Sequence, residues 1–138
     1  MNWAVYALIS AIFAALVAVF GKIGLKNIDS TLATTVRSIV MALFLVGVSF
    51  ALGKFSFLNT FSSKAAIFIV LSGIAGALSW LFYFFAIKAG NVSGVVAIDR
   101  TSVVFAFILA VLFLSEAFTL KKAFGAGLVA LGAILMAL

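Results

Sequence analysis

The 138-residue sequence contains no cysteine, no histidine and no proline, and only three acidic residues stand against nine lysines and arginines. Without cysteine the chain has neither disulfides nor thiolate metal sites. Without histidine it lacks the commonest general base and metal ligand. Ser, Asp and Lys would have to supply the nucleophile and base of an enzyme, and no such spacing is evident. The sequence therefore predicts no catalytic residues, no metal site and no cofactor.

The composition points to a membrane protein. Hydrophobic residues make up 67% of the chain and charged residues 9%, and the mean hydropathy is +1.45. A soluble domain is about half apolar and about a quarter charged, so the bilayer must be the solvent here. The net charge of +6 is expected at helix ends and against anionic headgroups, and it does not indicate nucleic acid.

Five apolar segments, separated by short polar breaks, account for most of the chain. Each is close to the ~20 residues that cross a hydrocarbon core, and the lack of two-residue alternation predicts helices. The segments run about Trp3–Leu25, Thr31–Leu52, Ala65–Ile87, Val92–Leu114 and Ala123–Leu138, the last with Thr119 as an alternative start. We therefore predict an all-α membrane protein with one five-helix transmembrane domain over residues 1–138. The first segment has no cationic start and no cleavage site, so we interpret it as a retained helix.

The breaks carry residues that typically begin helices. Ser, Thr, Asp and Asn accept hydrogen bonds from the first free amides of a helix, and Gly commonly follows its last turn. The candidates are Asp29, Ser30 or Thr31 for the second helix, Ser62 or Ser63 for the third, and Asn91 or Ser93 for the fourth, after a stop at Gly90.

Small residues recur at helical spacing in the first and last segments. One stripe comprises Ala7, Ala11, Ala14, Ala18 and Gly21, and the other comprises Ala126, Ala130, Ala133 and Ala137, with Gly125 and Gly132 close by. Such stripes let helix backbones approach closely in lipid. Packing within one chain and a subunit interface on the last helix are both compatible with the pattern.

The lysines specify orientation only weakly. Five crossings put the termini on opposite sides of the membrane. Lys54, Lys64, Lys121 and Lys122 would lie on the N-terminal side, and Lys26, Lys88 and, by snorkelling, Lys22 on the other. This distribution favours a cytoplasmic N-terminus and also permits insertion in both orientations. We expect a multi-pass protein of the inner cell membrane.

Four charged side chains interrupt the apolar segments: Lys22, Arg37, Asp99 and Arg100. An ionisable residue at the bilayer centre costs roughly 2.5–3.5 kcal/mol, and such residues usually line a pathway. At about 1.5 Å per residue from the helix starts, all four occupy one half of the membrane. We predict them to be substrate-binding or coupling residues, with Asp99 paired to Arg37 or Lys22 on another helix. A structural ion pair, or Asp99 capping a helix break after Gly94, is the alternative.

The third segment adds a polar face with aromatic neighbours. Ser72, Gly76, Ser79 and Tyr83 share this face, and Trp80, Phe82, Phe84 and Phe85 surround it. Rings beside small polar groups suit an organic solute, which adds Ser79, Trp80 and Tyr83 to the candidate site residues. The same pattern is typical of helix packing and of the interfacial aromatic belt.

Three stretches of the sequence resemble helices of a known protein family. The stretch "FAFILAVLFLSEAFT", Phe105–Thr119, resembles the penultimate helix of an EamA repeat in the drug/metabolite transporter superfamily, which ends in a Leu-small-Glu turn. "KKAFGAGLVALGAILM", Lys121–Met136, resembles its glycine-punctuated closing helix, and "YFFAIKAGNVSG" resembles the end of its third helix. Arg37 falls where the repeat often has an Arg. The resemblance covers essentially the whole chain, although the Pro that many repeats carry in the fourth helix is absent.

The resemblance implies one EamA-type half-transporter. Most members carry two inverted repeats, so two copies of this chain, as an antiparallel homodimer, would make the full transporter. The related small multidrug resistance proteins use a Glu in the first helix, and the first segment here has no acid, so that mechanism is not carried over. The embedded charge is net positive, which favours an anionic or zwitterionic small metabolite. A non-transporting accessory subunit or lipid-interacting scaffold is the alternative.

Overall fold

The computed structural model of the chain describes residues 2–60 and 62–138, and within them it contains helices and no strand. The helices are α1 (Trp3–Gly24), η1 (Leu25–Asn27), α2 (Ser30–Ala51), η2 (Lys54–Thr60), α3 (Ser63–Ala89), α4 (Val92–Asp99), α5 (Ser102–Phe113) and α6 (Leu120–Ala137). Five stretches in the described residues are long and apolar enough to span a membrane, with α4 and α5 forming one of them. The predicted five-helix membrane architecture is confirmed, and the last helix starts directly after Thr119.

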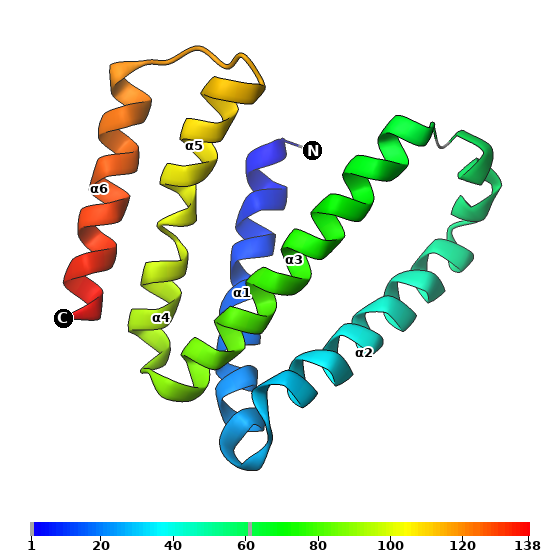
Figure 1. Cartoon of the computed structure of the whole chain (residues 1–138), viewed down its shortest axis with the longest axis horizontal. Helices are drawn as coiled ribbons and strands as arrows, with labels where there is room; N and C mark the ends of the chain where they lie inside the picture. The colour runs from blue at the N-terminus through cyan, green and yellow to red at the C-terminus, as the bar shows by residue number, and fades with distance from the viewer. Residues whose placement is uncertain (1, 61) are drawn as a thin grey trace. The chain divides into compact units, whose positions relative to one another are not determined.

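The chain divides into two compact units. The first comprises the residues up to Ile23 together with Ala89–Leu138, and in it α4 and α5 both pack against α6 (Figure 1). The second comprises Gly24–Lys88, where η2 joins α2 to α3 and packs back on α2. Its largest fully buried side chains are those of Leu25 in η1, Ser30 at the start of α2 and Ile87 near the end of α3.

Side-chain caps begin α2, α3 and α4, as the breaks in the sequence predict, and Thr119, predicted only as an alternative start, caps α6. In each cap a side-chain oxygen accepts a hydrogen bond from the backbone amide three residues later: Asp29 from Leu32 at 3.0 Å, Ser62 from Ala65 at 3.2 Å, Asn91 from Gly94 at 2.6 Å, and Thr119 from Lys122 at 3.3 Å. Each cap satisfies one amide that has no partner within its helix, which is a strong requirement close to lipid.

The Asp29 cap makes stability depend on pH. The Leu32 amide, helped by Thr31 and the charge of Lys88, lowers the pKa of this carboxyl below its usual 3.8. A carboxyl whose pKa is lower in the folded protein than in the unfolded chain stabilises the fold at pH values above its unfolded pKa. This stabilisation is lost as the pH falls through its folded pKa. Between about pH 5 and about pH 3 the melting temperature in detergent should fall more for the wild type than for Asp29→Asn, which still accepts the bond but does not titrate. Equal falls would contradict this role.

The fourth predicted span is interrupted although it contains no proline. Between α4 and α5 the amides of Thr101 and Val103 bond to carbonyls three residues earlier, Ile98 and Arg100, at 2.9 and 3.2 Å. The Thr101 hydroxyl also donates to the Ile98 carbonyl at 2.7 Å, and such side-chain bonds compete with the helix ladder. The break therefore lies after Asp99, the last residue of α4, and the predicted alternative of a break after Gly94 is wrong. Figure 1 shows the two pieces following one another in one span.

The Leu-Ser-Glu turn after α5 is a helix stop with a left-handed residue. Ser115 has a φ of 54°, and the amides of Leu114 and Glu116 both bond to the Ala110 carbonyl, at 3.0 and 3.2 Å. Glycine normally occupies such a left-handed position after the end of a helix.

Ser115 is therefore a position where glycine should stabilise the protein. Ser115→Gly removes the steric cost of the left-handed backbone and should raise the free energy of unfolding by up to about 1 kcal/mol. Ser115→Val should lower it, because a β-branched side chain tolerates this backbone least. Thermal unfolding in detergent measures the stability of both variants. If both substitutions raised the stability, or both lowered it, the left-handed backbone of Ser115 would not explain the effects.

The small-residue stripe of α6 has two sides. Ala126 and Ala133 are buried, whereas a Cβ added at Gly125 or Gly132 would meet nothing within 4 Å. The alanine side therefore takes part in packing within the chain. The subunit interface remains a prediction for the glycine side.

Candidate functional site

Arg37 of α2 lies on the ring of Trp80 of α3, inside the second unit. The Arg37 Cζ is 3.8 Å from the centroid of the Trp80 ring and 5.6 Å from that of Phe84. Trp80 in turn meets Tyr83 and Phe84 edge to face, with centroids 5.3 and 6.2 Å apart. A guanidinium stacked on an indole at this distance is strongly attracted to it, and the attraction grows when water is excluded. The predicted Arg37, Trp80 and Tyr83 are thus brought together.

One guanidinium nitrogen of Arg37 can still donate a hydrogen bond. Its Nη1 atom is buried and, in the part of the chain that the structure describes, it has no hydrogen-bond partner. A buried donor without an acceptor costs about 1–3 kcal/mol, and more when it is charged. A ring face supplies no strong acceptor, so an oxyanion that reached Nη1 would recover this cost.

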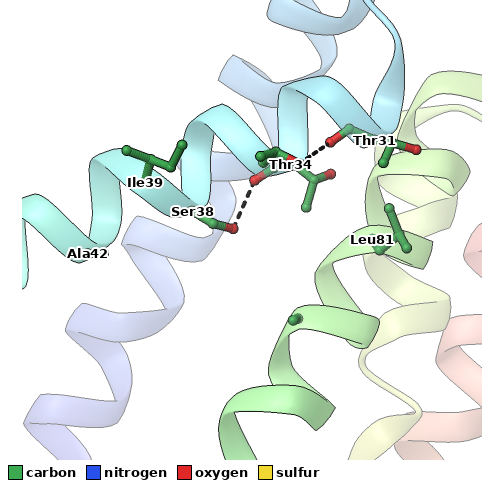
Figure 2. A pocket seen from close by; sticks show the side chains of 8 residues that line it. Thr31, Thr34, Ser38, Ile39, Ala42 and Leu81 are labelled. Carbon is green, nitrogen blue, oxygen red and sulfur yellow. Dashed lines mark hydrogen bonds between the residues drawn. The ribbon is translucent and has the colours of Figure 1, made fainter.

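A cavity of about 450 Å³ opens between α2 and α3 in the same unit. Hydroxyl residues of α2 line one part of it, and apolar residues of both helices line the rest: Thr31, Thr34, Thr35 and Ser38, then Ile39, Ala42, Ala77 and Leu81. Figure 2 shows the labelled threonines and Ser38 on α2 opposite Leu81 of α3. The volume of the cavity is in the range of pockets for small organic ligands.

The hydroxyl residues of this cavity were not among the predicted site residues. Their signal is present in the sequence as the run "TLATTVRS", which repeats Thr or Ser at helical spacing around Arg37. Such residues also occur in ordinary membrane helices, where they bond to their own backbone. Only the cavity distinguishes this run from that common case.

Asp99 and Arg100 lie in the other unit, at the break between α4 and α5. Asp99 is half-buried, and Arg100 is exposed. A mid-helix turn with three-residue bonds often marks a hinge, so both charges sit at the least regular point of the span. The pairing of Asp99 with Arg37 remains a prediction.

Lys22 has a structural bond in the first unit. Its ammonium donates to the Gly90 carbonyl at 2.8 Å, at the turn before α4. Lys88 makes a similar bond in the second unit, to the Ile28 carbonyl at 2.8 Å before α2. Lysines that neutralise free carbonyls hold such turns at the membrane boundary.

Ser79 lies apart from these contacts, on an exposed part of α3.

A second cavity, of about 390 Å³, lies between α5 and α6 in the first unit, and its polar end is the ion pair of Lys122 with Glu116 at 3.1 Å. The described residues contain no cluster of three or more metal-ligating side chains.

The comparisons with known proteins agree with the architecture. The model of the EamA-like transporter family matches residues 1–138. The chain belongs to this family. A protein of Sinorhizobium sp described as an uncharacterized transporter in the cobO 3' region is 38% identical over 136 residues, which cover 99% of this chain and 96% of that relative. No solved structure matches the chain.

Membership of the EamA-like family agrees with the resemblance drawn from the three helix motifs. Together with the five apolar stretches it makes the chain an integral, multi-pass membrane protein and indicates a membrane transporter rather than an enzyme. It assigns no role to individual side chains, so the candidate site depends on the geometry of Arg37, Trp80 and the α2–α3 cavity.

Proposed function

We propose that the chain transports a small anionic or zwitterionic organic metabolite across the inner cell membrane, with Arg37 binding its negative group. The observation that carries this proposal is the buried, unpartnered Nη1 of Arg37 on the Trp80 ring. The ring covers one face of the guanidinium and leaves it a directed donor. A structural arginine would normally have all buried donors satisfied.

We further propose that two five-helix units form an antiparallel homodimer that works by alternating access. The described residues carry one set of five spans, whereas alternating access in repeat-built transporters uses two such sets around a midplane site. The break between α4 and α5 supports this mechanism, because interrupted helices recur at such sites. Asp99, at the break, would bind a proton or ammonium group, or pair with Arg37 when the site is empty.

Reconstitution tests the transport function. Purified chain in proteoliposomes should take up labelled carboxylates, with or without an amino group, faster than empty liposomes. Absence of flux for every compound, together with purification as a stable complex with an unrelated membrane protein, would support the accessory-subunit alternative instead.

Single cysteines test the assembly, because the chain has none of its own. Asn27→Cys and Ala117→Cys lie in connections separated by an odd number of spans. In an antiparallel homodimer an impermeant thiol reagent should label both positions from both sides of the membrane. Labelling of each position from one side only would rule out this assembly, leaving a parallel dimer or a different partner.

A further inference from the structure

Three of the four α2 hydroxyls in the α2–α3 cavity have already used their protons. They donate to the carbonyl four residues earlier: Thr34 to Ser30 at 2.7 Å, Thr35 to Thr31 at 2.9 Å, and Ser38 to Thr34 at 2.8 Å. Figure 2 marks the bonds made among the cavity residues.

The cavity therefore presents more hydrogen-bond acceptors than donors. A hydroxyl has one proton and two lone pairs, so an oxygen whose proton is engaged can only accept from a ligand. Across the cavity, α3 contributes Ala77 and Leu81, which have no polar side-chain atoms. Of the four lining hydroxyls, those of Thr34, Thr35 and Ser38 have no proton left for a bound molecule. An anionic group would meet mainly oxygen lone pairs here.

An ammonium group fits this surface better than any neutral group. It has three donors and no acceptor, and its bonds to oxygen are roughly twice as strong as neutral ones. The apolar remainder of the cavity leaves room for a short aliphatic chain.

We propose that this cavity recognises the ammonium group of a zwitterionic solute whose carboxylate is bound by Arg37. Arg37 follows Thr34 by three residues, a spacing that puts Cβ atoms about 5–6 Å apart on a helix surface. Arg37 is not itself a lining residue of the cavity, so donors and acceptors are presented on neighbouring faces of α2. This inference rests on the proposed function and narrows its solute to the zwitterionic class, with Thr34, Thr35 and Ser38 as specificity residues.

Fluorescence of Trp80 can test the inference directly. The chain has two tryptophans, so Trp3→Phe leaves Trp80, beside Arg37, as the only reporter. Purified protein is titrated with β-alanine, propionate and propylamine, which share a carbon chain and differ in charged groups. We expect β-alanine to bind at least about tenfold more tightly than propionate, because one charge-assisted hydrogen bond raises the affinity by about this factor.

The hydroxyl variants locate the effect. Thr34→Val, Thr35→Val and Ser38→Ala together should abolish the advantage of β-alanine and leave propionate binding unchanged, which also shows that the variant is folded. The control is Ser56→Ala with Thr60→Val, whose hydroxyls bond to backbone carbonyls outside the cavity. The control should keep the full advantage.

The outcomes separate the two proposals. Equal affinity for β-alanine and propionate, or an advantage that survives the triple variant, would overturn the ammonium site and leave the Arg37 proposal intact. Propionate that does not bind, or that binds unchanged after Arg37→Ala, would instead refute the anion site on which this inference rests.

Discussion

Arg37→Ala is expected to reduce solute flux into proteoliposomes by about 10- to 100-fold. The estimate corresponds to the loss of one or two charge-assisted hydrogen bonds of about 1.5–3 kcal/mol in total. The guanidinium is held on the Trp80 ring at 3.8 Å, so its direction is already set before a solute arrives. Flux at several solute concentrations separates the loss of affinity from a loss of protein.

Arg37→Lys should restore little of this flux although it keeps the charge. A lysine ammonium is a point charge on a flexible stem, and it lacks the planar group that stacks on the indole and offers parallel donors. Trp80→Leu should have a smaller effect of the same sign, because the guanidinium remains but loses its fixed direction.

The exposed Lys121 provides the matched control. Lys121→Ala removes one positive charge at the end of a span and should leave flux unchanged. Wild-type flux in Arg37→Lys would mean that only charge matters, and wild-type flux in Arg37→Ala would show that Arg37 does not bind the solute.

Gly94→Val is expected to lower the free energy of unfolding by about 1–3 kcal/mol, the usual cost of overpacking. A Cβ on Gly94 would stand 2.6 Å from Asn91 Oδ1 and 3.5 Å from the Cα of Ala137. Asn91 can move away only by giving up its bond to the Gly94 amide, which caps α4. The same side chain would push against the end of α6, which packs on α4.

Two comparisons test this explanation in thermal unfolding experiments. Gly76→Val is the control, because a Cβ at this helical glycine would meet nothing within 4 Å, and its stability should change little. In the Asn91→Ala background the cost of Gly94→Val should shrink, since the cap is already lost and only the contact with α6 remains. Equal costs at the two glycines would contradict the packing argument.

The break between α4 and α5 illustrates what a local motif search misses. Proline is the usual signal for a kink and is absent here, so the sequence predicted a break in the fourth segment only as an alternative, after Gly94. The interruption instead comes from three-residue hydrogen bonds and the Thr101 hydroxyl, which any Ser or Thr in a helix has the opportunity to make. Whether such a bond wins over the regular ladder depends on packing around the helix, which is not a local property.

The sequence by itself determined the membrane class, the five spans and most helix starts. These follow from the length of the apolar runs and from capping residues such as Asp29 and Asn91, which act within a single turn of the chain. It also identified Arg37 as unusual, because a charge inside an apolar run carries its cost wherever the helix packs.

Only the tertiary structure decided what surrounds that charge. Nothing within the second segment indicates that Trp80, from the next helix, lies over the guanidinium, or that Thr34 and Ser38 face a cavity. A helix has lipid, protein and cavity as alternative neighbours for each face, and in a chain this apolar the residues suit all three. The choice among them is made by the packing of one helix against another, which local sequence does not encode.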